Sequence, residues 1–463
     1  MRVWLLAAGA LAAIVALGFA RPHPTPGPPM RDFEAYYAAG TLWSHGGDPY
    51  SQAIWPAEQP LSGVDAQRYE ALPFVGPPAV LPLFALVARL PFDAANALWR
   101  ALLIAALAAI ALLALRMAHH RITPFTFLAI AIAALGFGPL TSALALGQIA
   151  LPAFACAVMA LSWQPAAFFA WAQPNVALAL VPQLVTRRAL GFLAAAALFG
   201  AACLLSVGTS GLERYAGVLH EHAWAEQFSA IQLTPASIAY GFGASPQIAA
   251  VIGTAAAIAA IGCWTLLIRA DSDPAARFAA SCALLPLAMP FFHEHDLLVV
   301  FVPAVLYATR GDGRTWPLAA GGAMLAATDW LGLAQRPDGT LQTLLLAGAF
   351  GAGLAALAPR PHPRMLVVPG AVLALIGIAS LAAHAHPAPV WPDAMGALPR
   401  DIASMDISHA WNAEQRATGL FGRDAIWSAL RLLSLAGCAL TATAIAVSSR
   451  YPAGSKKPLP AQA

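Results

Sequence analysis

The chain has 463 residues, of which 59% are hydrophobic and only 10% are charged. A soluble globular domain is about a quarter charged, so a chain of this length and composition cannot cover a water-exposed surface, and we expect lipid to be its main solvent. The net charge of +3 is small and no basic stripe with interleaved aromatic residues is present, which argues against a nucleic-acid partner.

The first apolar run, Val3–Ala20, follows Met1 and Arg2. Alanine-rich runs of the same kind recur along the whole chain, so we interpret this one as a signal anchor rather than a cleaved leader.

A membrane helix needs roughly 20 mainly apolar residues. Fourteen segments meet or approach this length: Val3–Ala20, Ala79–Leu90, Ala94–Leu115, Pro124–Leu140, Leu146–Leu161, Ala166–Leu184, Ala189–Val207, Ile248–Ile268, Phe278–Pro290, Leu297–Ala308, Pro317–Leu333, Leu341–Leu357, Met365–Ala383 and Ile426–Val447.

Basic residues between these segments indicate on which side of the membrane each loop of the second half lies, because cytoplasmic loops are enriched in Lys and Arg. From Ala189 onward, simple alternation places every basic loop in the cytoplasm. In the first half it places Arg116 and Arg121 outside, which conflicts with the rule. The conflict is relieved if Ala79–Leu90 and Ala166–Leu184, both interrupted by proline, are re-entrant. Twelve and fourteen spans therefore both remain open.

Three long loops fall on the outer side: residues 21–78, 208–247 and 384–425. Residues 1–447 are interpreted as one membrane domain and residues 448–463 as a short cytoplasmic tail. The five cysteines all lie in apolar runs without CxxC spacing, which predicts neither a disulfide nor a cysteine-held metal.

The segment from Arg31 to Ser51 predicts a short amphipathic helix that begins near Asp32. Tyr36 and Tyr37 suit the headgroup level, and the Gly-Asp-Pro turn before Tyr50 ends the helix. A carboxylate just after the first span is well placed to act as a general base. The alternative is that Asp32 only caps the helix.

The strongest local signal is the run from His293 to Asp296, four ionisable residues that interrupt an apolar hairpin. Such groups at membrane depth are costly and usually functional. The His-x-His pairs at His293 and at His384 invite a metal interpretation, but this spacing alone lacks further ligands, and we expect no metal. Gln148 and Gln173 lie in apolar stretches, where glutamine commonly links helices.

These motifs together resemble glycosyltransferase family 87. The resemblance spans roughly residues 32–303. It is carried, in order, by Asp32-Phe33 with Tyr36-Tyr37-Ala38-Ala39-Gly40, Gly47-Asp48-Pro49-Tyr50, Pro77-Pro78, Leu90-Pro91-Phe92, Ala97-Leu98-Trp99, Gly147-Gln148, Gln173-Pro174-Asn175 and Glu294-His295-Asp296-Leu297. The chain departs from the family pattern at Gln173, where lysine is frequent, and in its His-Glu-His-Asp cluster.

The resemblance implies an all-α GT-C-like bundle of about 12–14 transmembrane helices with long outer loops. It implies an inverting hexosyltransferase of the bacterial inner membrane that acts outside the cytoplasm. The donor would be a polyprenyl-phosphate sugar, typically mannose, and the acceptor a glycan, glycolipid or protein of the envelope. No further cofactor is needed, because the carrier phosphate already activates the sugar.

Site roles follow from the resemblance and from the charge pattern. Asp32 would be the general base, and His295 would hold the carrier phosphate or the acceptor. Substrate binding is assigned to Arg31, Tyr36, Tyr37, Asp48, Tyr50, Gln148, Gln173, Arg214, His293, Glu294 and Asp296. Two alternatives remain: a transporter or flippase for a lipid-linked saccharide, which would usually show internal repeats and midplane charges, and a non-catalytic assembly subunit.

Overall fold

A computed structural model of the chain describes residues 1–18, 30–58, 60–61, 72–270, 273–310, 315–328, 330, 339–358, 363–384, 405–417 and 419–450. Over these ranges the chain is helical and contains no strand beyond one isolated bridge between Gln232 and His293. The predicted all-α class is confirmed.

The helices, in chain order, are α1 (Arg2–Gly18), α2 (Arg31–Ser44), α3 (Ile54–Glu58), η1 (Pro78–Val80), α4 (Leu81–Val87), α5 (Phe92–Met117), α6 (Pro124–Gly136), α7 (Gly138–Leu146), α8 (Ala150–Ala160), η2 (Gln164–Ala166), α9 (Ala167–Ala170), α10 (Pro174–Ala177), η3 (Leu178–Val185), α11 (Ala189–Glu226), α12 (Pro235–Gly241), α13 (Pro246–Ala270), α14 (Pro274–Ala288), η4 (His295–Val300), α15 (Phe301–Arg310), α16 (Thr315–Ala326), α18 (Gly339–Leu357), η5 (Pro363–Leu366), α19 (Val367–His384), α20 (Ile407–Ala417) and α21 (Ala425–Arg450). Each predicted apolar segment contains one or more of these helices.

Among the described residues, five helices are long and apolar enough to cross a membrane: α5, α11, α13, α18 and α21. A sixth is obtained if α6 and α7, which meet at an angle of 69°, form one broken span. Proline at the start of α7 is compatible with such a break. The chain is therefore a polytopic membrane protein. The predicted number of twelve to fourteen spans depends on the shorter apolar helices and stays a prediction.

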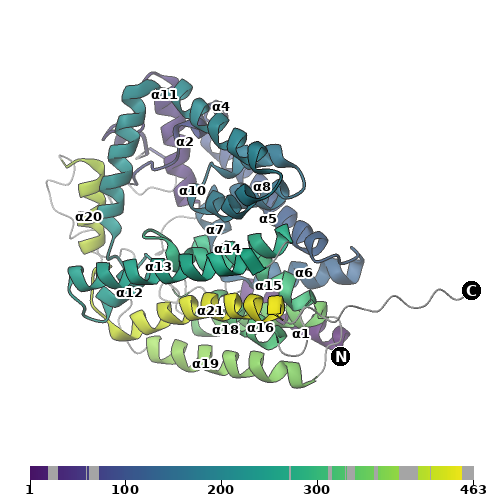
Figure 1. The fold of residues 1–463 in the computed structure, drawn as a ribbon. Helices are drawn as coiled ribbons and strands as arrows, with labels where there is room; N and C mark the ends of the chain where they lie inside the picture. The colour runs from purple at the N-terminus through teal and green to yellow at the C-terminus, as the bar shows by residue number, and fades with distance from the viewer. Residues whose placement is uncertain are drawn as a thin grey trace, which may run out of the picture.

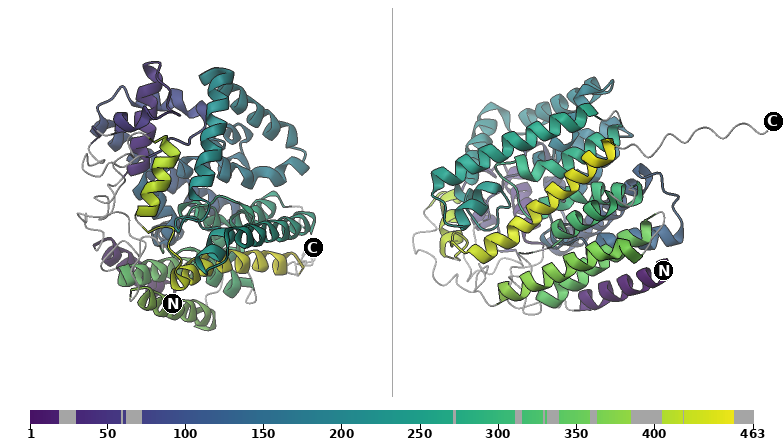
Figure 2. Two further views of the ribbon diagram at one scale, coloured as in Figure 1. Left: turned by 90° about the vertical axis from the view of Figure 1, so that its left-hand side faces the viewer. Right: turned by 60° about the horizontal axis from the view of Figure 1, so that its bottom comes forward.

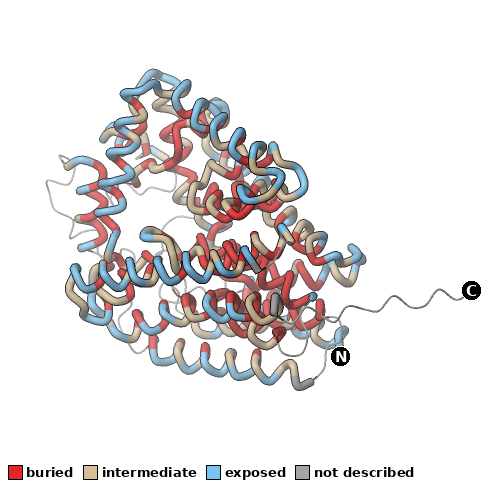
Figure 3. The backbone as a smooth tube through the Cα atoms, in the orientation of Figure 1, coloured by how far each residue is buried: buried red, intermediate tan, exposed pale blue. Residues whose placement is uncertain are grey.

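Apolar side chains cover the outside of the bundle. Leu205 on α11 is 87% exposed, and Ile258 on α13 is 67% exposed. Figure 3 shows that exposed residues follow the outer faces of the peripheral helices, while buried residues gather between the helices. An apolar exterior of this kind matches a lipid environment, because hydrocarbon leaves such side chains without a hydrophobic penalty.

Two groups of helices run crosswise to each other. Figure 1 shows α13, α14 and α21 side by side, and the second half of α11, together with α20 and α2, lying across one side of them. The views in Figure 2 show the same arrangement. The start of α1 and the end of α21 lie away from α20. The crosswise group contains parts of all three predicted outer loops.

Helix α11 extends far beyond its predicted apolar segment. It continues to Glu226 across one non-helical residue, Gly208, whose φ of 68° and ψ of −176° bend the helix. The first part of the predicted 208–247 loop is therefore helical. By contrast, Ala79–Leu90 and Ala166–Leu184 form only short helical pieces, as expected for segments interrupted by proline.

Some predicted features lie outside the described residues. These are the proline-rich start of the first outer loop, residues 385–404 of the 384–425 loop with His386, and the tail beyond residue 450. The side chain of His384 also lies outside them, so the second His-x-His pair has no structural description. The division into one domain and a tail stays a prediction.

The predicted helix near Asp32 is confirmed as α2, and it is packed within the protein. Phe33 is fully buried and Tyr36 is 8% exposed. At Gly40 a Cβ would lie 2.3 Å from the backbone carbon of Phe84, so α2 packs directly on α4. Neighbouring helices therefore cover the Tyr36 side chain, and its placement at the headgroup level stays a prediction.

Glycines allow α16 and α21 to approach closely. A Cβ on Gly437 would lie 2.4 Å from the carbonyl oxygen of Gly322, and a Cβ on Gly322 would lie 2.7 Å from that of Gly437. Small residues at such contacts let membrane helices pack by van der Waals contact.

We expect Gly437→Leu to lower the thermal unfolding midpoint of the detergent-solubilised protein by several degrees, because the side chain must push the two backbones apart. Gly262→Leu is the matched control, since Gly262 is exposed on α13 with no atom near the position of a Cβ. Equal midpoints for both variants would contradict the packing argument.

Candidate active site

The carboxylate of Asp32 is held by a glutamine from a distant part of the chain. The Nε2 of Gln148 donates a hydrogen bond to Oδ2 of Asp32, and the hydroxyl of Tyr36 donates to Oε1 of Gln148 over 3.1 Å. The helix begins after Met30, which has a φ of 70° and makes no side-chain cap. The alternative that Asp32 caps α2 is therefore wrong. Its carboxylate faces Gln148 instead.

The turn between α7 and α8 positions Gln148. Gly147 has a φ of 80°, and a Cβ there would lie 2.9 Å from the Cβ of Phe33. The carbonyl oxygen of Gly147 accepts a hydrogen bond from Nε1 of Trp99 over 2.8 Å, and the N–H of Met30 donates to the carbonyl oxygen of Ala145 over 2.7 Å. Backbone conformation and backbone contacts therefore join this turn to the start of α2.

A second polar group forms around Asp296, which is fully buried. Its carboxylate accepts a hydrogen bond from the N–H of His293 over 3.1 Å. The side-chain amides of Gln173 and Asn175 each lie 3.5 Å from one of its oxygens. The structure thus brings the Gln-Pro-Asn motif together with the histidine cluster. Asn175 was not predicted as a site residue.

The rings of His293 and His295 stack at a centroid distance of 5.2 Å and an interplanar angle of 16°. Burial lowers the pKa of His293, but the nearby charges of Glu226, Asp296 and Asp32 and a hydrogen bond to Glu226 outweigh it, so this pKa is raised. Burial lowers the pKa of His295 to about 4, although Asp296 opposes it. At neutral pH the positive charge therefore favours His293, and His295 is neutral.

The two polar groups are close enough to influence each other. Burial raises the pKa of the Tyr36 hydroxyl, and the charges of Asp32 and Asp296 raise it further. Asp32 also contributes to the raised pKa of His293. Helices α7 and α8, on either side of Gln148, both pack against η4, which contains His295 and Asp296. Asp32, which Gln148 contacts, and the cluster at residues 293–296 therefore lie around one region.

Glu226, at the end of α11, is the main residue that sequence reasoning missed. It is 1% exposed, and its Oε2 lies 2.9 Å from Nε2 of His293. Gln232 and Trp411 also donate hydrogen bonds to its carboxylate. The only signal in the sequence was that acidic and histidine residues gather in the outer loops, which does not select this residue.

Other predicted residues lie apart from this region or make different contacts. Asp48 pairs with Arg214 at 2.6 Å. The hydroxyl of Tyr37 donates to the carbonyl oxygen of Leu90. These contacts join α2 and the turn after it to their neighbours.

Three further predicted residues have defined contacts. The hydroxyl of Tyr50 donates to the carbonyl oxygen of Gly76 over 2.9 Å, and the carboxylate of Glu294 accepts from the N–H of Trp330. The guanidinium of Arg31 lies 5.4 Å from the ring centroid of Trp411. Arg31 thus reaches a residue that binds Glu226, whereas Tyr50 and Glu294 make contacts to the backbone.

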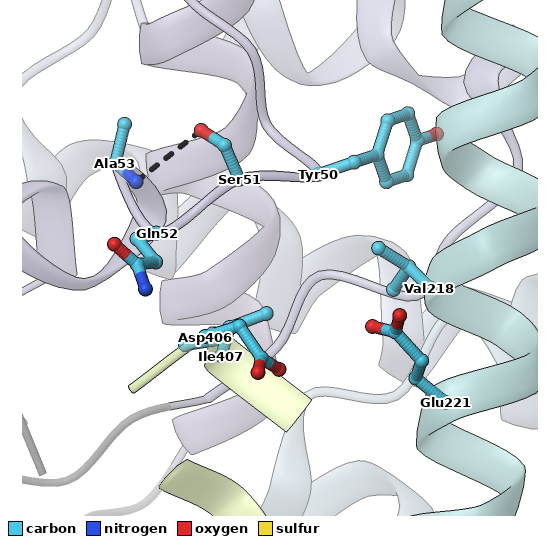
Figure 4. Close-up of a pocket in the computed structure, with 8 residues that line it drawn as sticks. All are labelled: Tyr50, Ser51, Gln52, Ala53, Val218, Glu221, Asp406 and Ile407. Atoms are coloured by element: carbon cyan, nitrogen blue, oxygen red, sulfur yellow. Dashed lines mark hydrogen bonds between the residues drawn. The ribbon is translucent and has the colours of Figure 1, made fainter. Parts of the chain in front are cut away.

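A pocket of about 440 Å³ lies beside the crosswise helices. Figure 4 shows carboxylates from two elements at this pocket, Glu221 from α11 and Asp406 before α20. The remaining lining residues are Tyr50, Ser51, Gln52, Ala53, Val218 and Ile407. Hydroxyl, amide and carboxylate groups of this kind can hydrogen-bond to a hydroxyl-rich ligand.

Among the described residues, His293, His295 and Asp296 could together offer one ligand atom each to a metal ion, since these atoms lie within 4.8 Å of one another. Asp296 is also engaged by amide donors. The expectation that the protein binds no metal stays a prediction.

The fold and this region together define a polytopic α-helical membrane protein in which a carboxylate and a histidine-acid cluster share a buried polar region. The family model of glycosyltransferase family 87 matches residues 74–290. The resemblance predicted from the motifs is therefore confirmed, and it indicates a membrane glycosyltransferase. Asp32 lies well before the matched range, and the cluster at residues 293–296 lies just after it. No curated protein and no solved structure matches the chain.

Proposed function

We propose that this protein transfers a hexose, typically mannose, from a polyprenyl-phosphate carrier to a glycan, glycolipid or protein of the bacterial envelope. The reaction would take place at the outer face of the inner membrane. The observation that supports this most strongly is the convergence of Asp32 and the His293–Asp296 cluster: Gln148 contacts both Asp32 and Tyr36, and the helices on either side of Gln148 pack against η4. A base and a phosphate-binding group must both be near the anomeric carbon for such a transfer.

In this mechanism Asp32 takes the proton of the acceptor hydroxyl as its oxygen attacks the anomeric carbon. The bond from that carbon to the carrier phosphate oxygen breaks, and the polyprenyl phosphate leaves with the bonding electrons. Attack opposite the leaving group inverts the anomeric configuration. The negative charge that develops on the phosphate needs a preorganised positive or hydrogen-bonding partner. The raised pKa of His293 makes it the best candidate for that charge.

His295 then acts as a neutral hydrogen-bonding group. Its lowered pKa keeps the imidazole uncharged at neutral pH, so one ring nitrogen can donate and the other can accept. The sugar is already activated by the carrier phosphate, so the scheme requires no metal or other cofactor.

The pocket beside α11 and α20 is a suitable place for the acceptor. Glu221 precedes Glu226 by five residues, which is about 7.5 Å along the helix. Ile407 precedes Trp411 by four residues, about 6 Å along α20. The pocket is therefore adjacent to the Glu226–Trp411 contact, and the hydroxyl, amide and carboxylate groups in its mixed lining suit sugar hydroxyls.

Removing a pocket carboxylate should weaken acceptor use without affecting the chemical step. We expect Glu221→Gln to raise the KM for the acceptor by about two- to tenfold with little change in kcat, since one hydrogen bond contributes about 0.5–1.5 kcal/mol. Steady-state kinetics over a range of acceptor concentrations measures both. A lowered kcat with unchanged KM would argue against this location for the acceptor.

Gln148 should support the base. Gln148→Leu removes the hydrogen bonds to Asp32 and Tyr36, and we expect kcat to fall about tenfold because a misplaced base loses much of its effect. Gln164→Leu is the control, because Gln164 contacts the backbone of Arg188 away from the site. If both variants transfer sugar at the wild-type rate, Gln148 does not orient Asp32.

The proposal is tested by reconstituting the purified protein in liposomes with labelled polyprenyl-phosphate-mannose and an envelope glycolipid fraction. Transfer of label to the glycolipid is the expected result, and a nucleotide sugar should not replace the lipid-linked donor. Movement of the labelled lipid between leaflets without transfer would favour the flippase alternative. If the protein shows neither sugar transfer nor lipid movement, the alternative of a non-catalytic assembly subunit is favoured.

A further inference from the structure

Glu226 occupies a position where four parts of the chain meet. It ends α11, and Oε1 lies 3.3 Å from Nε2 of His222 one helical turn before it. Its other partners are His293, Gln232 and Trp411 from α20. A carboxylate that is 1% exposed is costly to bury unless it is paired and hydrogen-bonded. Here it has several donors, so the arrangement can be stable.

The contact with Glu226 fixes the direction of the His293 ring. With Nε2 directed at Glu226 over 2.9 Å, Nδ1 lies 4.0 Å from Oδ2 of Asp296. One face of the ring stacks on His295, and the ring of Phe291 meets it at 89° with a centroid distance of 4.8 Å. The imidazole is thus constrained at one edge by Glu226 and by neighbouring rings. A carboxylate that orients a histidine in this way is a common supporting arrangement in active sites.

The same carboxylate connects this ring to the outer segment α20. Nε1 of Trp411 donates to Glu226, and the amide of Asn412 donates to the carbonyl oxygen of Ala225 over 2.7 Å. The guanidinium of Arg31 lies over the ring of Trp411 at 5.4 Å, one residue before Asp32 in the chain. The contacts of Trp411 therefore extend from Glu226 to the start of α2.

We propose that Glu226 is a positioning residue that acts through His293: it holds Nε2 of the imidazole and so fixes the ring beside Asp296, while Trp411 fixes α20 to the same carboxylate. This inference rests on the proposed function, because it assigns His293 to the phosphate of the donor. It goes beyond that function because it makes Glu226, which does not contact the substrate, responsible for part of the affinity for the phosphate.

The test measures binding of farnesyl phosphate, a short carrier lipid without sugar, to the purified protein by isothermal titration calorimetry. We expect Glu226→Gln to weaken the affinity about tenfold, because loss of the charge-assisted hydrogen bond releases His293. His293→Ala should weaken the affinity at least as much. The double variant should bind no more weakly than His293→Ala, because Glu226 has no effect once His293 is absent.

Glu213→Gln is the matched control, since Glu213 is exposed on the same helix, and it should bind as the wild type does. If Glu226→Gln does not fold, Glu226→Asp, which keeps the charge, takes its place. It is then compared with His293→Ala and with the corresponding double variant. Wild-type affinity in the Glu226 variants, or effects that simply multiply in the double variant, would overturn the inference. Absence of farnesyl phosphate binding by the wild type would instead overturn the proposed donor class, and the inference with it.

Discussion

Asp32→Asn should lower kcat for sugar transfer by about 10²- to 10⁴-fold, the usual contribution of a general base. The change keeps the shape of the side chain, and the Asn oxygen can still accept a hydrogen bond from Gln148. What is lost is the ability to take a proton from the acceptor hydroxyl. Donor binding should therefore be nearly unchanged, so the loss should fall on kcat and not on the KM for the donor.

Single-turnover measurements with labelled donor would separate this chemical step from product release. Asp93→Asn provides the control, because Asp93 is exposed at the start of α5, and it should transfer at the wild-type rate. A variant without the Asp32 carboxylate that retains wild-type kcat would remove Asp32 from the mechanism.

Asp296→Asn should also reduce transfer, by about 10²-fold, and should lower stability as well. Three N–H groups, from His293, Gln173 and Asn175, are directed at the Asp296 carboxylate. An asparagine offers only one oxygen, so at least one of these partly buried donors loses its partner, at a cost of about 1 kcal/mol. The change also removes a negative charge that favours the protonated form of His293.

Stability and transfer can be distinguished with Asp273→Asn. Asp273 caps α14 at the end opposite the site and pairs with Arg310 at 2.9 Å. This control should lower the thermal unfolding midpoint but leave the transfer rate per folded molecule unchanged. Full activity per folded molecule in Asp296→Asn would show that Asp296 contributes only to folding.

The helices could be predicted from the sequence because lipid imposes a simple requirement on composition and length. Each of the fourteen apolar segments contains helix, and the proline-interrupted ones are the most broken. Breaks within helices were harder to predict. The angle between α6 and α7 and the continuation of α11 to Glu226 depend on what packs beside them, which composition does not record.

Within the candidate site, motif order was more informative than any single residue. Gln148 beside Asp32, and Gln173 beside Asp296, join motifs that are more than 100 residues apart. The order of the motifs along the chain predicted that they belong to one family pattern, but it could not predict which ones touch. Those contacts depend on the tertiary structure.

Glu226 illustrates what remained out of reach. It is surrounded in the sequence by alanine, tryptophan and glutamine, with no motif spacing to His293. Only packing reveals that this carboxylate is buried while its neighbour Glu221 lines an open pocket. The burial of Tyr36 was out of reach for a related reason, since an aromatic residue suits both a lipid interface and a protein interior.

The bend in α11 makes the site sensitive to a single backbone position. From Gly208 to Glu226 the helix advances about 27 Å. A small change of angle at Gly208 therefore displaces Glu226 by a large distance. A change of about 10° in the bend would move Glu226 by about 5 Å, more than the 2.9 Å that separates it from His293. A φ of 68° is strained for any residue with a side chain. The identity of residue 208 therefore affects the position of Glu226 relative to His293, at the far end of the helix.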